Sequence, residues 1–190
     1  CMEWAEIAGR KRLMVGGRVN RFIPNPTFDP VARPGSLDQF FRGRNPEGKN
    51  MRELFGRLEP IAPAYRDRDA RLESLDSQGV EGTLLFPTLG VGMQESLRHD
   101  PEAAAVAFTG FNRWLEEDWG FSYQDRLYAA PYLSLMDAEW AEAEVDSLIE
   151  RGARIISMVP GPVPIGNASR SLADPCYDGF WGRVNEAGIS

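Results

Sequence analysis

Histidine and cysteine are scarce in this 190-residue chain, which contains one histidine and two cysteines. The single imidazole, on His99, excludes a mononuclear metal site with several histidine ligands built from this chain alone. His99 stands between Arg98 and Asp100 at an expected helix start, where a surface or capping role is the simpler interpretation. Two cysteines, Cys1 and Cys176, are too few for a disulfide framework, which favours a reducing compartment and predicts a cytoplasmic protein.

Long apolar runs and an excess of positive charge are also missing. No run approaches the roughly 18 consecutive apolar residues that span a membrane, so the sequence predicts no membrane association. Acidic residues outnumber basic ones, 28 against 21, which gives a net charge of −7. Because nucleic acids are bound through positive fields, we expect no nucleic-acid partner. The 43% of hydrophobic and 26% of charged residues are typical of a globular domain.

The first 63 residues predict a β-hairpin followed by an irregular insertion. Two β-compatible runs, 12–15 and 18–22, flank a Gly-Gly pair suited to a primed turn, because both turn positions need positive φ. Prolines and glycines then interrupt the chain as far as Pro63, so only short helical pieces over 37–41 and 51–55 are expected. The insertion carries aromatic side chains that argue against disorder: Phe22, Phe28, Phe40, Phe41 and Phe55.

From residue 64 to 190, helical patterns alternate with short apolar runs. Helices are expected over 66–78, after Asp100-Pro101, after Asp137 and over 178–187, and buried strands over 81–87, 126–135 and 153–159. Such alternation predicts right-handed crossovers and a parallel sheet. Three strands are too few to close a barrel, which takes about 250 residues. Gly188-Ile189 repeats the helix-to-strand junctions Gly79-Val80 and Gly152-Ala153, which predicts another strand from Ile189.

Four stretches of the sequence, taken in order, carry a family resemblance. They are 79–88 (Gly-Val-Glu-Gly-Thr-Leu-Leu-Phe-Pro-Thr), 111–117 (Phe-Asn-Arg-Trp-Leu-Glu-Glu), 126–131 (Arg-Leu-Tyr-Ala-Ala-Pro), and Asp174-Pro175 with Tyr177-Asp178 and Phe180-Trp181. As a set they resemble the amidohydrolase-2 family, metal-dependent (β/α)8 barrels related to aminocarboxymuconate-semialdehyde decarboxylase. The segment 13–26 resembles an insertion that some bacterial members carry after the first strand. The resemblance covers nearly all of residues 10–189.

This resemblance implies an α/β fold, a partial (β/α)8 TIM barrel holding roughly strands 2–4 and their helices. Residues 1–63 would be the insertion with its hairpin, and residues 64–190 the barrel segment. The family holds its metal by a His-x-His pair on the first strand, histidines on the fifth and often the sixth, and an Asp after the eighth. None of those positions falls within this segment. The resemblance therefore implies a divalent metal, zinc or similar, in a longer protein, and none bound by this chain alone.

The chemistry implied by the resemblance is hydrolysis or non-oxidative decarboxylation of a small carboxylated or amide substrate. Barrel enzymes place their sites at the C-terminal ends of the strands. The family often has a basic residue after the fourth strand, but residues 158–162 contain none, so no anion-anchoring role is expected there. The positions at these strand ends that would form the wall of a substrate pocket are Phe86, Pro87, Thr88, Ser134, Met158 and Pro160.

Two hypotheses remain at the level of the sequence. The chain is a segment of such an enzyme, or it is a non-catalytic α/β module that binds a ligand or partner through residues 10–63. In the first case the short sheet has two unpaired edges, and unpaired edges are templates for further pairing. We then expect the edges to be covered by the remaining barrel segments or by a second copy of the chain.

Overall fold

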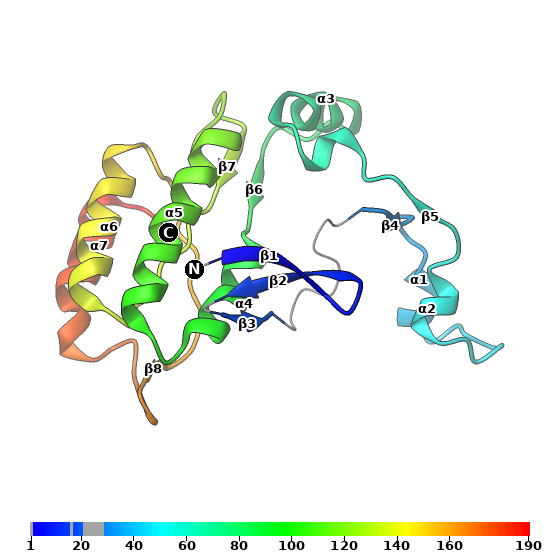
Figure 1. Ribbon diagram of the computed structural model, residues 1–190. Helices are drawn as coiled ribbons and strands as arrows, with labels where there is room; N and C mark the ends of the chain where they lie inside the picture. Colours follow the sequence, from blue (N-terminus) through cyan, green and yellow to red (C-terminus); the bar gives the residue numbers. More distant parts are fainter. Residues whose placement is uncertain (1, 16, 21–28) are drawn as a thin grey trace.

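The computed structural model describes residues 2–15, 17–20 and 29–190, and it has three parts (Figure 1). A body of helices packs against a short parallel sheet, an N-terminal antiparallel sheet lies beside it, and residues 29–63 extend away. Gly16 of the expected turn, and residues 21–28 with two of the insertion's aromatic side chains, lie outside the described residues. No helix in the described ranges is long and apolar enough to cross a membrane.

The N-terminal sheet contains the expected hairpin and one additional strand. Its antiparallel strands are β1 (Met2–Ile7), β2 (Arg10–Val15) and β3 (Arg18–Val19), in that order. Met14 opposite Val19 fixes the register of the hairpin. The buried side chains of Leu13 and Val15 join the main core, so the hairpin is anchored to the helical body. β1 was not expected from the sequence, because its residues alternate poorly between apolar and polar types.

Residues 29–63 form small local structures with no buried residue. The two expected helical pieces are confirmed as α1 (Asp38–Phe41) and α2 (Met51–Leu54). β4 (Val31–Ala32) pairs with β5 (Leu58–Glu59), and the short 3-10 helix η1 (Pro63–Tyr65) leads out of the segment. Phe41 is 74% exposed, and its ring contacts that of Phe40 edge to face, with the centroids 5.6 Å apart.

The parallel sheet begins with β6 (Thr83–Leu85), which pairs with β7 (Leu127–Ala129) in the register Thr83 to Leu127. α3 (Arg68–Gln78) precedes β6 and ends at Gly79, whose φ of +66° is the left-handed conformation that glycine adopts without strain. Arg126 ties the two together: its guanidinium donates to the carbonyls of Glu81 and Val80 and pairs with Asp76 at 2.7 Å.

The helices of the body are α4 (Thr88–Leu97), α5 (Pro101–Asp118), α6 (Ala138–Glu150) and α7 (Asp178–Ala187). Asp100 caps α5 by accepting from the N–H of Ala103, and Asp137 caps α6 in the same way at Trp140, which confirms both expected starts. Helix α4 was not expected, because no side chain caps it and it contains two glycines of low helix propensity. The core between these helices includes Phe108, Phe111, Val145, Leu148 and Phe180.

The prediction of a regular strand over 153–159 is wrong. One bridge joins Ser157 to Tyr132 in parallel, and the N–H of Leu133 donates to the carbonyl of Ser157 at 2.9 Å. On the other side, the N–H of Ile156 donates to the carbonyl of Ser190 at 2.8 Å, which places residues 189–190 where the next strand is expected. Pro131 and Pro160 supply no N–H and shorten the ladder.

The chain then adds an unexpected hairpin, β8 (Val163–Ile165) with β9 (Ala168–Arg170), and the 3-10 helix η2 (Pro175–Tyr177). The fold is mixed α/β and does not close into a barrel.

Candidate functional site

A small hollow, partly open to solvent and with a cavity volume of about 10 Å³, lies at the C-terminal ends of the second and third parallel segments. Helix α4 contributes Gln94, and the chain after β7 contributes Ser134 between two leucines. Met158 comes from the end of segment 153–159, and the loop before β8 closes the remaining side. Parallel strands direct their C-terminal ends to one edge of the sheet, which explains why residues from such distant positions meet here.

Two buried polar side chains give this hollow its chemical character. Gln94 is 7% exposed, and its Oε1 accepts a 2.8 Å hydrogen bond from the Tyr132 hydroxyl. Ser134 is 3% exposed, and its Oγ accepts from the N–H of Met136 at 3.4 Å. The hydroxyl proton of Ser134 is therefore available to another acceptor.

Tyr132 is the central side chain beneath the hollow. It is fully buried, its ring packs against Phe108 with centroids 4.7 Å apart, and its hydroxyl is held by Gln94. Helix α4 approaches the ring so closely that a Cβ placed on Gly90 would lie 2.7 Å from Tyr132 Cδ2. A glycine at this position is what allows the helix to lie on the ring.

Asn112 of α5 holds the backbone of Tyr132 from the other side. Its Oδ1 accepts the N–H of Tyr132 at 2.8 Å, and its Nδ2 donates to the carbonyl of Tyr132 at 3.0 Å. The Asn112 amide thus takes the place of a neighbouring strand, because it pairs with the backbone N–H and carbonyl of Tyr132. The second Nδ2 proton goes to Glu144 of α6 at 2.9 Å, so every hydrogen-bonding group of this buried amide is used.

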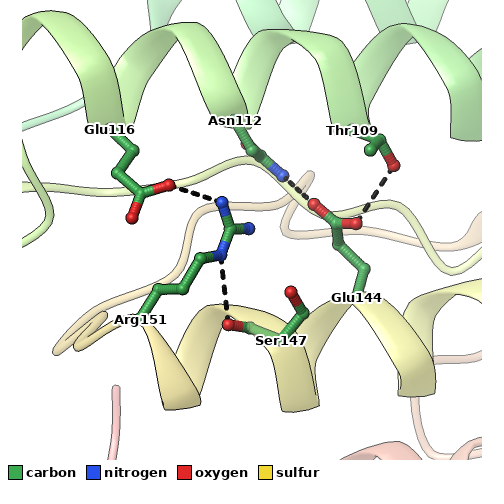
Figure 2. A network of polar contacts seen from close by, with 6 residues as sticks. All are labelled: Thr109, Asn112, Glu116, Glu144, Ser147 and Arg151. Carbon is green, nitrogen blue, oxygen red and sulfur yellow. Dashed lines mark hydrogen bonds and ion pairs between the residues drawn. The ribbon is translucent and has the colours of Figure 1, made fainter.

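Glu144 belongs to a polar network between α5 and α6 (Figure 2). The second carboxylate oxygen of Glu144 accepts a hydrogen bond from the Thr109 hydroxyl at 3.0 Å. Further along the two helices, the Arg151 guanidinium donates to the Glu116 carboxylate at 2.5 Å and to the Ser147 carbonyl at 3.2 Å. Because Asn112 connects this network to the strand, the two helices fix the backbone that leads to Ser134. The polar network therefore stabilises the backbone around the hollow, but its side chains do not line the hollow.

A second hollow, with a cavity volume of about 280 Å³, lies between η1, α3 and α5, beside β6. It is lined mostly by apolar and aromatic side chains: Tyr65, Leu85, Phe86, Pro87, Phe111, Trp114, Leu115 and Trp119, with Thr88 and Arg71. In the described part of the chain β6 pairs only with β7, so its other edge is unpaired, and Leu85 of this strand borders the apolar hollow. Leu84 on that strand is 49% exposed, and Phe86 directly after the strand is 66% exposed.

The six sequence-predicted wall residues do not share one pocket. Ser134 and Met158 line the smaller hollow, whereas Phe86, Pro87 and Thr88 line the apolar one, and Pro160 is exposed and lines neither. The chain turns into α4 immediately after Pro87, which separates the end of β6 from the other two strand ends. The sequence analysis did not identify Gln94, Tyr132 or Asn112 as site residues. Gln94 lies on α4, a helix without a recognisable start signal in the sequence. The contact between Asn112 and Tyr132 joins a helix to a strand 20 residues away, so no local sequence pattern indicates it.

The residues that the structure describes do not fit a metal centre. No group of three or more His, Cys, Asp or Glu side chains among them is arranged to hold an ion. His99 is exposed in the turn between α4 and α5, consistent with a surface role.

The alkaline titration of Tyr132 offers a direct check of its burial. Burial raises the pKa of its hydroxyl well above the ordinary value of 10.0. The unfolded chain then loses this proton at lower pH than the folded chain does, so we expect stability to fall as pH rises above about 10. Urea unfolding at increasing pH measures how the free energy of unfolding changes with pH. Tyr132→Phe should remove the part of that pH dependence that Tyr132 contributes. An unchanged slope in Tyr132→Phe would contradict the burial.

Comparison with known proteins adds what the geometry alone does not provide. The sequence matches no family model and no curated protein. The chain is similar to the crystal structure of an amidohydrolase from Mycobacterium avium subsp. paratuberculosis K-10, with 43% identity and a TM-score of 0.91 over 99% of this chain. This match confirms the predicted resemblance to the amidohydrolase-2 family. The chain spans 50% of the Mycobacterium amidohydrolase, so it corresponds to about half the length of that relative.

Two further structures resemble this chain in fold. Both are 2,6-dihydroxybenzoate decarboxylase, one described as the enzyme from Rhizobium and one as its complex with 2,6-dihydroxybenzoate. Each match has 23% identity and a TM-score of 0.51, covering 84% of this chain and 45% of the other. At that identity the likeness concerns the fold alone.

Proposed function

We propose that this chain is part of a metal-dependent amidohydrolase-like enzyme that hydrolyses or non-oxidatively decarboxylates a small carboxylated or amide substrate. The observation that carries the proposal is the 43% identity to an amidohydrolase across 99% of the chain. Residues 64–190 would form a partial (β/α)8 barrel, roughly strands 2–4, and residues 1–63 an insertion beside it. The parallel pairing of β6 with β7 and the parallel bridge between Tyr132 and Ser157 support this arrangement, and Ile156 is hydrogen-bonded to Ser190 on the far side.

The chain would contribute pocket wall rather than reacting groups. Ser134 and Met158 already meet at one hollow, and Phe86, Pro87 and Thr88 follow the neighbouring strand. Pro160 would lie at the rim. A divalent metal, zinc or similar, would be held by residues of the longer protein, since the described residues of this chain do not supply a ligand set.

The free edge of β6 is the place where another barrel segment would join. An added strand would satisfy the unpaired N–H and C=O groups of β6 and cover the exposed side chains of Leu84 and Phe86. The adjoining apolar hollow, with Trp114 and Trp119 in its wall, would bury the apolar residues of the same segment. We expect this partner to be the half of the amidohydrolase fold that the chain does not span, with a second copy of the chain as the competing outcome.

Co-expression tests this proposal. The chain is produced with the half of the Mycobacterium amidohydrolase that it does not cover, each half carrying a different affinity tag. We expect the halves to co-purify and the complex to contain bound metal by elemental analysis. Leu84→Asp, which places a charge at the β6 edge, should reduce co-purification at least tenfold. Val106→Asp is the matched control, because Val106 is 64% exposed on α5 and lines neither hollow.

Activity is then measured on the purified complex with 2,6-dihydroxybenzoate, by release of carbon dioxide, and with amide substrates, by release of amine. Failure of the halves to associate, together with cooperative unfolding of the chain as a monomer, would favour the non-catalytic α/β module. Equal effects of Leu84→Asp and Val106→Asp would show that β6 is not the joining edge. Dimers of the chain alone that Leu84→Asp dissociates would identify a second copy as the partner.

A further inference from the structure

We infer that Arg71 forms an ion pair with an acidic side chain of the half of the amidohydrolase fold that this chain does not span, here called the partner half. The inference rests on the proposed function, because the partner half is the segment proposed to join at β6. It goes further by naming the chemistry of the contact. The apolar hollow beside β6 would receive an acidic side chain flanked by apolar residues.

The first step is that Arg71 of α3 carries a charge without a polar partner in the described part of the chain. Within residues 2–15, 17–20 and 29–190, its buried Nε forms no hydrogen bond and no carboxylate pairs with its guanidinium. Asp67, one turn earlier, caps α3 instead, because its Oδ1 accepts from the Ala70 N–H at 2.7 Å. A buried charged donor without an acceptor costs free energy, which an acceptor brought by another segment would recover.

The second step is that the guanidinium is held at the wall of a hollow that lacks negative charge. Arg71 borders the hollow of about 280 Å³, and its Cζ lies over the Tyr65 ring, 4.7 Å from the ring centroid. Stacking on an aromatic face restrains an arginine without using its N–H groups. No acidic side chain of the described residues lines this hollow, so a carboxylate for Arg71 would come from another segment.

The third step is that the surroundings of Arg71 have the composition of a protein interface. Tyr65, Phe86 and Trp114 border the hollow, and all three side chains are exposed. Tyrosine, tryptophan and arginine are the residues that most often dominate the binding energy of protein interfaces. Leu85 also borders the hollow, and it belongs to β6, whose second edge is unpaired within the described residues. The hollow is therefore continuous with the strand at which the partner half is proposed to join.

The length of the chain and its charge favour the partner half as the occupant. The chain spans 50% of the Mycobacterium amidohydrolase while matching it over 99% of its own length, so that relative has a second half to cover this surface. A second copy of the chain would bring the same net charge of −7, and like net charges oppose self-association. A carboxylate is the acceptor that matches a guanidinium best, because it can take two parallel hydrogen bonds from it.

The test co-expresses the chain with the half of the Mycobacterium amidohydrolase that it does not cover, and measures how much of that half is recovered with the tagged chain. Arg71→Met removes the charge and keeps an unbranched side chain, and it should reduce recovery at least about tenfold. Arg113→Met is the matched control, because Arg113 is exposed on α5 and borders neither hollow. Recovery with Arg113→Met should stay within about twofold of that with the unmodified chain.

Charge reversal distinguishes a carboxylate from a neutral acceptor. Arg71→Glu should reduce recovery further than Arg71→Met, because it places two like charges in the apolar hollow. Changing one Asp or Glu of the partner half to arginine should then restore recovery at least about fivefold, and a scan of its acidic positions identifies that residue. The inference is wrong if no acidic position restores recovery, or if Arg71→Met and Arg113→Met behave alike.

The stability of the chain alone separates an interface role from a structural one. Because the Arg71 guanidinium has no polar partner among the described residues, Arg71→Met should leave the midpoint of urea unfolding unchanged or raise it. A lower midpoint together with unchanged recovery would show that Arg71 only supports Tyr65, and would overturn the inference.

Failure of this inference is distinguishable from failure of the proposed function. Halves that associate, bind metal and respond to Leu84→Asp but not to Arg71→Met would overturn the ion pair and leave the proposed function standing. Halves that do not associate at all would contradict the proposed function and the ion pair together. Dimers of the chain alone that Arg71→Met dissociates would place a second copy on the hollow and overturn the partner half as its occupant.

Discussion

Replacing Asn112 by leucine is expected to lower the free energy of unfolding by about 3–5 kcal/mol, a large share of the roughly 5–15 kcal/mol of a typical domain. Asn112 is fully buried and bonds both the N–H and the carbonyl of Tyr132. Leucine has a similar volume but no polar atoms, so both backbone groups would be left unpaired in the core. Each such group costs about 1–3 kcal/mol, and Glu144 also loses a donor.

Urea unfolding followed by circular dichroism measures this effect. Asn185→Leu is the matched control, because Asn185 is exposed on α7, and its change should stay within about 0.5 kcal/mol. Asn112→Leu should also broaden the backbone amide signals of residues 132–134, since their backbone loses its anchor. Similar stabilities for the two variants would show that Asn112 does not clamp the strand.

Alanine at Gly90 is expected to destabilise the protein by about 1–3 kcal/mol, although alanine is the better helix former. The added Cβ would lie 2.7 and 2.8 Å from two ring atoms of Tyr132. That ring has no room to move, because it is packed against Phe108 and tethered through Gln94. Either α4 must shift away from the sheet or the ring must leave its position, and both disturb the hollow.

Gly110→Ala is the matched control for this substitution. Gly110 also lies within a helix, α5, but a Cβ built there would meet no atom within 4 Å. The same chemical change should therefore stabilise the protein by up to about 1 kcal/mol through helix propensity alone. Thermal unfolding of the two variants distinguishes the cases, and equal signs for both would refute the close contact between α4 and Tyr132.

Local chemistry explains which elements could be predicted. Asp100 and Asp137 signal helix starts because their carboxylates bond the free N–H groups of the first turn. Gly79 and Gly188 signal helix ends because their positive φ suits a residue without a side chain. These interactions join residues three or four apart, so the sequence expresses them directly. The predicted resemblance to the amidohydrolases rested on four short stretches of sequence in a fixed order. The 43% identity to an amidohydrolase confirmed it.

The elements that were missed depend on partners far away in the chain. Helix α4 has no capping side chain and contains Gly90 and Gly92, so its stability comes from packing on Tyr132 and β2. The first hairpin turns through Ala8-Gly9, where an alanine at φ +49° is an unusual choice for such a turn. Segment 153–159 has the composition of a strand, yet a ladder forms only where neighbouring backbone is positioned to pair.

The same division applies to the candidate site. The sequence by itself determined the helix caps, the parallel order of the short sheet, and that Ser134 and Met158 follow neighbouring strands. Only the tertiary structure decided that Gln94 reaches the same hollow, that Asn112 clamps Tyr132, and that Phe86 and Thr88 lie at a different, apolar surface. The physical reason is range: caps and turns are satisfied within a few residues, whereas a buried amide takes whichever acceptor the packed helices bring to it.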